Sequence, residues 1–186
     1  KKLKRNDTAT AGCKLYLTKP LGVGIFTTAQ KQGKLLPEHA NIAPDAMSKL
    51  NSIGEKLADI EGVTAMTDVT GFGLLGHLSE MCEGSKLSAE IEFNKIPIFP
   101  DVHFYLDQKC IPGGTHRNWE SYGHLIQLQD DKQKLILCDP QTSGGLLIAV
   151  EENSTAEVEK LLLNRGIEPV VIGKILAKSE VLIKIV

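Results

Sequence analysis

The sequence has 186 residues, of which 42% are hydrophobic, enough to bury one sizeable core or at most two small ones. Its net charge of -2 is nearly balanced, which indicates neither the strongly basic face of a typical nucleic-acid-binding protein nor an acidic tail. No apolar run approaches the roughly 20 residues that a membrane-spanning helix needs, and no signal peptide precedes the first predicted strand. We therefore expect a cytoplasmic protein that binds neither nucleic acid nor membrane.

In chain order, hydrophobic periodicity and turn residues divide the sequence into elements. Short apolar or alternating runs are predicted strands, and runs with apolar residues at three- and four-residue spacing are predicted helices. The prediction is a strand at 13–18, a strand or helix at 21–26, a helix at 44–59, a strand at 63–69, a helix at 74–84, a strand at 87–93, a helix at 102–109, a polar surface loop at 111–131, strands at 135–138 and 146–150, a helix at 154–164, and strands at 170–175 and 181–186.

Two of the predicted helices carry terminal signals. Pro44 suits the first helical position, and Asp45 suits the positive end of the helix dipole. Ser154 and Glu157 have the spacing of a capping box, and Gly166 is a typical residue just past a helix end. Because helices and strands are interspersed and several strands are adjacent, we predict an α+β layered domain with a mixed β-sheet. With no internal repeat or long linker, residues 1–186 are predicted to be one domain.

The basic residues and the cysteines do not point to a site. Four basic residues cluster at the start of the chain, which we interpret as a ragged, solvated end: Lys1, Lys2, Lys4 and Arg5. The four cysteines are scattered without a Cys-x-x-Cys pair, which fits a reduced protein better than a disulfide framework or a zinc site. No cysteine has an obvious activating neighbour, so we assign no nucleophile.

The segment TDVTGFGLLGH, from Thr67 to His77, is the strongest candidate site. Asp68 ends a buried-looking strand and precedes closely spaced glycines and a helix start, which is a geometry suited to metal-bound phosphate. Its carboxylate can hold Mg²⁺ as a hard oxygen ligand, although an Asp before a glycine turn is commonly a turn residue. Thr67 and Thr70 could donate to phosphate oxygens or be local backbone partners. His77 is better explained by helix packing than by metal ligation.

A second loop, DPQTSGG from Asp139 to Gly145, lies between two predicted strands. Its amides could cradle an anion, but Asp-Pro and Gly-Gly are also ordinary turn residues. The segment at 113–118 fits a substrate-facing loop or, more simply, an ordered surface excursion. Neither a P-loop nor a strand–GxGxxG–helix motif occurs, which excludes the common P-loop enzymes.

Four strings resemble the C-terminal half of the selenophosphate synthetase (selenide, water dikinase) family: AGCKLYLTKPLGVGIFTTA, EGVTAMTDVTGFGLLGHLSEMC, PGGTHRN followed by SYGH, and LCDPQTSGGLLIAV. They occur in the family's order, and the resemblance covers nearly the whole chain from Asn6 onward. The wider superfamily includes aminoimidazole ribonucleotide synthetase, thiamine-monophosphate kinase and a hydrogenase-maturation protein. Their C-terminal domain is an α+β layered module, which agrees with the fold predicted above.

The resemblance implies an enzyme that makes selenophosphate, AMP and phosphate from selenide, ATP and water, with Mg²⁺ and commonly K⁺, as a homodimer. In the family, the catalytic cysteine or selenocysteine and most metal-binding aspartates lie in an N-terminal domain, whose motifs are absent from this sequence. The chain therefore resembles the C-terminal domain alone, and we expect it to be inactive by itself. By resemblance, Asp68 matches a Mg²⁺ ligand that helps to hold the ATP phosphates. No equally firm role follows for the loop from Gln141 to Gly145.

Two other functions remain open. The chain could be a non-catalytic packing or dimerisation domain, in which Asp68 is only a turn residue. It could also belong to a related ATP-dependent synthetase or kinase of the same superfamily, although the string TDVTGFGLLGH disfavours this.

Overall fold

The computed structural model describes residues 3–186. The strands of this part of the chain are Lys14–Leu17 (β1), Val63–Asp68 (β2), Ser88–Ile91 (β3), Ile126–Gln127 (β4), Leu146–Val150 (β5), Val171–Leu176 (β6) and Ile183–Ile185 (β7). The α-helices are Val23–Lys31 (α1), Ile42–Ser48 (α2), Ile53–Leu57 (α3), Gly73–Ser85 (α4), Val102–Asp107 (α5), Gly113–Tyr122 (α6), Gln133–Leu137 (α7) and Thr155–Leu163 (α8). Short 3₁₀ turns lie at Pro37–His39, Phe93–Lys95, Gly123–Leu125 and Glu152–Ser154.

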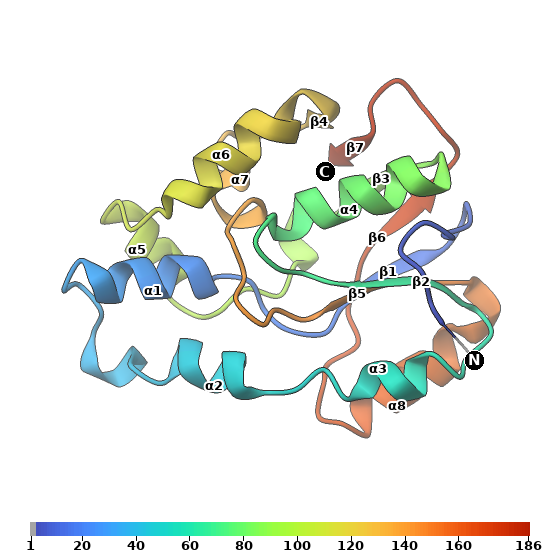
Figure 1. The fold of residues 1–186 in the computed structure, drawn as a ribbon, viewed down its shortest axis with the longest axis horizontal. Coiled ribbons are helices and arrows are strands. Elements are labelled where there is room, and N and C mark those ends of the chain that lie inside the picture. Colours follow the sequence, from blue (N-terminus) through green and yellow to red (C-terminus); the bar gives the residue numbers. More distant parts are fainter. Residues whose placement is uncertain (1–2) are drawn as a thin grey trace.

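The described strands form one mixed sheet in the order β2-β5-β1-β6-β3-β7-β4 (Figure 1). The pairs from β2 to β3 are antiparallel, whereas β7 lies parallel to both β3 and β4. Strand β2 is at one edge, paired on its inner side so that Asp68 lies opposite Leu146 of β5. The predicted α+β fold with a mixed sheet is therefore confirmed.

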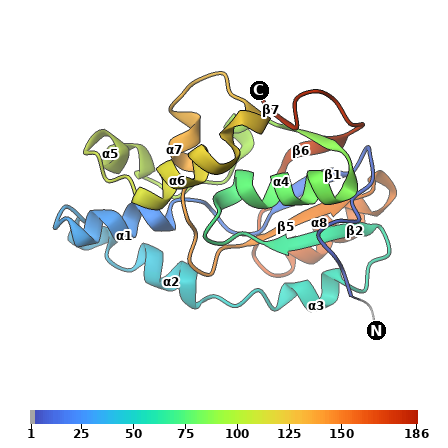
Figure 2. The same ribbon diagram turned by 45° about the horizontal axis from the view of Figure 1, so that its top comes forward.

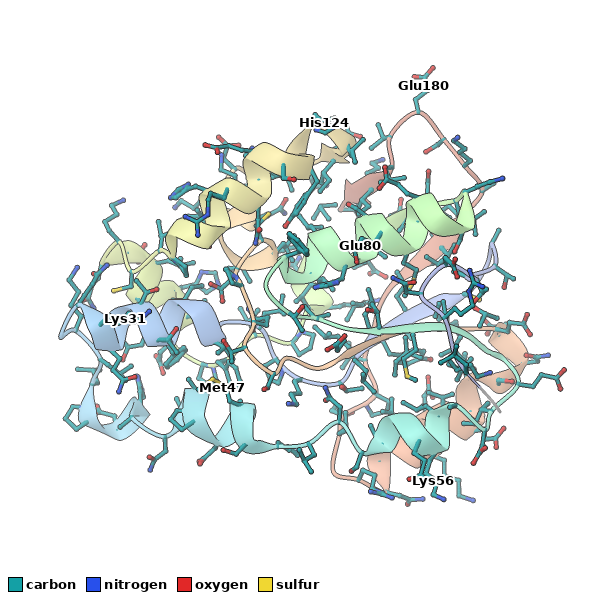
Figure 3. The ribbon with its side chains drawn as sticks, viewed as in Figure 1. Lys31, Met47, Lys56, Glu80, His124 and Glu180 are labelled. Carbon is teal, nitrogen blue, oxygen red and sulfur yellow. The ribbon has the colours of Figure 1, made fainter. Side chains whose placement is uncertain are left out.

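Helices cover both faces of the sheet (Figure 2). Successive residues of a strand point to opposite faces, so Leu15 and Leu17 of β1 join one core while Tyr16 joins the other. The larger core contains the buried side of α4, and the smaller one contains the buried residues of α3 and α8. Figure 3 labels Glu80 on α4 and Lys56 on α3, which lie on opposite sides of the sheet.

The predicted helix at 44–59 is wrong, because two short helices, α2 and α3, occupy this region. Tertiary hydrogen bonds end α2 early. The ammonium group of Lys19 donates to the carbonyl oxygens of Ala46, at 3.1 Å, and Lys49, at 2.6 Å. The side-chain amide of Asn51 then donates to the Gly144 carbonyl oxygen at 2.8 Å, which fixes the linker between the helices. Helical periodicity in the sequence continues across this break, so local pattern alone could not locate it.

Two further predictions are wrong. Residues 135–138 lie in and just after α7 instead of forming a strand, because a four-residue apolar run does not distinguish a strand from one helical turn. Much of the loop predicted at 111–131 is helix α6, which packs against α4 and buries Thr115, Asn118 and Tyr122. The ambiguous segment at 21–26 contains the start of α1.

The helix predicted at 154–164 is confirmed as α8, but its capping box is not formed. A 3₁₀ turn, Glu152–Ser154, precedes the helix, and the Ser154 hydroxyl makes no cap hydrogen bond. It donates to the Asn153 side chain at 3.3 Å instead. Gly166 has φ +68°, as expected for a residue just past the helix end.

The ends of β2 and β5 are joined by close backbone contact. The Val69 amide donates to the Gly145 carbonyl oxygen at 2.8 Å, and a Cβ atom at Gly144 would lie 2.1 Å from the Val69 carbonyl oxygen. Only glycine permits this approach without moving one of the two loops.

We predict that Gly144→Ala destabilises the chain by about 1–3 kcal/mol, the usual range for overpacking at a site that cannot expand. The matched control is Gly71→Ala in the facing loop, where an added Cβ has no heavy atom within 4 Å. The control should change stability by less than about 0.5 kcal/mol. Urea unfolding followed by circular dichroism measures both, and equal midpoints for the two variants would contradict the prediction.

Candidate functional site

Asp68 is the last residue of the edge strand β2, and its side chain is exposed. It lines an open cavity of about 630 Å³, which we call the Asp68 cavity. The polar residues of this cavity include Arg5, Asp7, Asn51 and Thr67. Tertiary structure thus brings together three separate segments: the start of the described chain, the linker between α2 and α3, and the end of β2.

The start of the described chain is not a ragged end. The ammonium group of Lys4 donates to the Ile60 carbonyl oxygen at 2.8 Å, and the Met66 amide donates to the Arg5 carbonyl oxygen at 3.0 Å. The interpretation as a ragged end is therefore wrong for Lys4 and Arg5, because the Lys4 side chain and the Arg5 backbone are hydrogen-bonded to the body of the domain. The Arg5 side chain is solvated, as expected. Lys1 and Lys2 lie outside the described residues.

The donor chemistry of the Asp68 cavity fits part of a Mg²⁺ site. Asp68 offers a carboxylate, whereas the Asp7 carboxylate already pairs with the Arg5 guanidinium. Among the described residues, no group of three or more His, Cys, Asp or Glu side chains could hold a metal by itself. Mg²⁺ commonly uses one or two protein carboxylates and completes its shell with water and substrate phosphate oxygens. Asp68 can serve as such a single ligand.

The two threonines of the motif have different partners. The Thr67 hydroxyl donates to the Asp68 carbonyl oxygen at 3.3 Å, so it is a local backbone partner here. The Thr70 hydroxyl lies 3.0 Å from Nε2 of His77, and Nδ1 of His77 lies 3.2 Å from the Glu80 carboxylate. His77 is buried on α4, while Glu80 is at the surface of that helix (Figure 3). When Nδ1–H donates to Glu80, Nε2 accepts a hydrogen bond from the Thr70 hydroxyl and fixes the orientation of that hydroxyl.

The DPQTSGG loop covers the start of helix α1. Oδ2 of the Asp139 carboxylate accepts hydrogen bonds from the amides of Gly24, at 3.0 Å, and Ile25, at 3.4 Å. The side-chain oxygen of Gln141 accepts from the amides of Gly22 and Val23, both at 3.3 Å. These bonds satisfy the otherwise unpaired amides of the first helical turn. The side chains of Asp139 and Gln141 therefore stabilise the start of α1 and are not presented to a ligand at the surface.

Asp139 is fully buried, and burial raises the pKa of its carboxyl to about 7. The side-chain amide of Gln141 donates to Oδ2 at 2.8 Å, and this bond and those from the α1 amides favour the charged form. Loss of water outweighs them, because Oδ1 is buried without a hydrogen-bond partner in the structure. A proton on the carboxyl removes the cost of burying a charge.

Helix α6 is hydrogen-bonded to the loop at 69–72, which connects β2 to α4. The buried Asn118 of α6 donates to the carbonyl oxygens of Gly71, at 2.9 Å, and Cys138, at 3.0 Å. It thereby joins the loops at 69–72 and 139–145, which we call the two glycine loops. Tyr122 donates its hydroxyl to the Phe72 carbonyl oxygen. Residues 113–118 therefore form the start of a structural helix and not the loop predicted from the sequence. The polar composition of the segment gives no indication of this supporting role.

Sequence reasoning also missed Lys19, which is almost fully buried. Besides its two bonds to the α2 region, its ammonium group donates to the Ser143 carbonyl oxygen at 2.6 Å. Burial lowers the pKa of this amine. The sequence does offer one indication of a buried role for Lys19, because this lysine directly follows a predicted buried strand and precedes a proline.

The cysteine thiols are unsuited to nucleophilic attack. All four are buried and unbonded to one another. Burial raises the pKa of Cys82 to about 12 and that of Cys138 to about 11, so both are protonated at neutral pH.

In the described part of the chain, no helix is long and apolar enough to cross a membrane.

Comparison with known proteins identifies relatives along nearly the full length of the chain. The family model described as AIR synthase related protein, C-terminal domain, matches residues 10–185. A protein of Pasteurella multocida named selenide, water dikinase is 57% identical over 178 residues, which are 96% of this chain and 51% of that protein. The chain thus spans about half the length of this curated relative.

Solved structures share the fold at low sequence identity. Thiamine-monophosphate kinase from Stenotrophomonas maltophilia K279a superimposes with a TM-score of 0.69 at 16% identity, covering 98% of this chain and 52% of that one. A hydrogenase maturation protein HypE in complex with ATP superimposes with a TM-score of 0.63 at 20% identity, covering 94% of this chain and 45% of that one. At these identities the likeness shows the fold alone.

We predict that Asp139 makes the chain less stable as pH rises from about 4 to 7. The carboxyl loses its proton near pH 3.8 when unfolded and near pH 7 when folded, so ionisation favours the unfolded chain across this window. The full effect is up to about 4 kcal/mol at about 1.4 kcal/mol per pH unit.

Urea unfolding between pH 4 and 8 tests this contribution. Asp139→Asn should abolish this part of the pH dependence, whereas Asp107→Asn, at an exposed carboxyl on α5, should retain it. Parallel profiles for the wild type and Asp139→Asn would contradict the prediction.

Proposed function

The chain belongs to the AIR synthase related protein, C-terminal domain family, and from this membership we propose that it is the C-terminal domain of a selenide, water dikinase. The observation that carries the proposal is the 57% identity to a protein of that name over 96% of the chain. The parent enzyme would convert selenide, ATP and water to selenophosphate, AMP and phosphate. On this proposal residues 1–186 are a single domain, and an N-terminal domain completes the enzyme.

Asp68 is proposed to be a Mg²⁺ ligand of the parent enzyme. Its position at the end of an edge strand, exposed and facing an open cavity, supports this role. When bound, Mg²⁺ would neutralise phosphate charge during phosphoryl transfer. The chain itself would supply the carboxylate and one wall of the nucleotide cleft. The loops that hold Asp68 in place are packed against each other, which keeps this ligand at a fixed position.

Other properties of the parent follow from the same proposal. We propose a cytoplasmic homodimer that takes ATP and selenide as substrates, uses Mg²⁺ and has a possible requirement for K⁺. The ATP complex of a HypE with the same fold supports ATP as the nucleotide. No role in nucleic-acid or membrane binding is proposed.

A non-catalytic packing or dimerisation domain is the second candidate. It is favoured by the burial of Asp139 and Gln141. Their side chains accept hydrogen bonds from the amides of α1 and are therefore used in holding the fold together. On this view, Asp68 would be a turn residue, and the catalytic groups would lie entirely outside the chain.

We predict that Asp68→Asn in the full-length parent lowers selenide-dependent AMP formation by at least about 100-fold, since it removes a charge that holds the metal at the transferring phosphate. Phosphorus NMR of AMP and selenophosphate measures the loss. The melting temperature should be unchanged because Asp68 is exposed. Asp107→Asn is the matched control and should keep full activity. Unchanged turnover in Asp68→Asn would instead support the packing domain.

We predict that the 186-residue chain alone forms no AMP from ATP and selenide, because its described residues contain no cluster of carboxylates, histidines or cysteines that could hold the metal without the other half of the enzyme. Adding the separately produced N-terminal part should restore measurable turnover if the two halves reassemble. Selenide-dependent AMP formation by the chain alone would show that it contains a complete active site.

A further inference from the structure

We propose that Arg5 is a phosphate-binding residue in the Asp68 cavity, where it contacts the phosphate chain of a Mg²⁺-bound nucleoside triphosphate. This inference rests on the proposed function and extends it to a residue that belongs to neither glycine loop. It follows from three features of the structure: the fixed backbone of Arg5, the pairing of its guanidinium with Asp7, and the mixed charge of the cavity.

The position of Arg5 is set by its backbone and by Asp7. Its carbonyl oxygen accepts the Met66 amide of β2, two residues before Asp68 on the same strand. Its Nε donates to Oδ1 of Asp7 at 2.6 Å, and its Nη2 donates to Oδ2 of the same carboxylate. Asp7 thereby raises the pKa of the guanidinium and orients it. Arg5 is thus held beside the metal-ligand candidate even though it precedes it by more than 60 residues in the chain.

The paired guanidinium keeps donors for a ligand. A guanidinium has five N–H groups, and the Asp7 carboxylate takes two of them, the one on Nε and one on Nη2. Three N–H groups remain: the second one of Nη2 and both of Nη1. The Arg5 side chain is 61% exposed, so these donors face solvent and need not be stripped of structural partners. Lys4 differs, because its ammonium group donates to the carbonyl oxygens of Ile60 and Glu61.

The charges around the cavity favour a metal-bound polyphosphate over a simple anion or cation. Neither a free phosphate group nor a free divalent cation is favoured, because the cavity presents both signs of charge in equal number: two carboxylates, Asp7 and Asp68, and two cations, Lys4 and Arg5. A Mg²⁺-bound triphosphate satisfies both, because its metal can take the Asp68 carboxylate while its outer oxygens accept from a planar guanidinium. A cavity of about 630 Å³ is within the usual range for a small-molecule ligand.

The test uses the full-length parent enzyme with Arg5→Gln, Arg5→Lys and Arg165→Gln. Arg165 is exposed after α8 and lies outside the Asp68 cavity, so its variant is matched in residue type and charge change. Calorimetric titration with Mg²⁺-ATP gives Kd, and selenide-dependent AMP formation gives KM and kcat. We expect Arg5→Gln to raise Kd and KM for Mg²⁺-ATP about tenfold, with a smaller change in kcat. Arg5→Lys should be intermediate, since it keeps the charge without the fork, and Arg165→Gln should match the wild type.

A wild-type Kd in Arg5→Gln, or an equal loss in Arg165→Gln, would overturn the role of Arg5. The two proposals fail differently. If the wild type binds Mg²⁺-ATP but forms no AMP with selenide, the proposed reaction is wrong, while the calorimetric comparison still decides the role of Arg5. If the wild type does not bind Mg²⁺-ATP, the inference about Arg5 is wrong as well. Equal melting temperatures of the variants would confirm that the change in Kd is not caused by unfolding.

Discussion

The hydrogen bonds that Asp139 and Gln141 accept at the start of α1 tie together the parts of the chain that form the candidate site. A buried carboxyl in this position replaces the solvent that would otherwise satisfy the first helical amides. The same loop continues into Gly144, which touches the backbone of Val69 directly after β2. The position of Asp68 therefore depends on the buried hydrogen bonds between the loop at 139–145 and the start of α1, which lie away from the surface where a ligand would bind.

Two other buried polar side chains extend this contact into a network. Lys19 links α2 and its linker to the carbonyl oxygen of Ser143, and Asn118 links the two glycine loops through Gly71 and Cys138. Each donates to main-chain carbonyl oxygens of neighbouring loops, and such hydrogen bonds typically contribute about 1 kcal/mol each. Because most partners are main-chain atoms, the network specifies loop shape more than side-chain identity. Such a network is consistent with the proposal that Asp68, at the end of a strand, is a metal ligand.

Sequence reasoning located Asp68 and the element on either side of it. It could not distinguish the roles of the two glycine-rich loops, since an acid next to glycines looks the same whether it faces solvent or a helix start. Asp68 is exposed and Asp139 is buried, and only the packing of α1 against the second loop separates them. The prediction of one helix at 44–59 fails for a similar reason, because residues from distant parts of the chain bond to this region: Lys19 donates to the Ala46 carbonyl oxygen, and the Gly144 carbonyl oxygen accepts from Asn51.

By itself, the sequence determined the α+β class, most strands, the helices α4, α5 and α8, the resemblance to a family and the candidate Asp68. These follow from local periodicity and from contiguous strings of residues. Tertiary structure alone decided the order of the strands, the burial of Asp139 and Lys19, and the placement of Arg5 beside Asp68. Each of these depends on contacts between residues far apart in the chain, whose burial and partners local propensity does not encode.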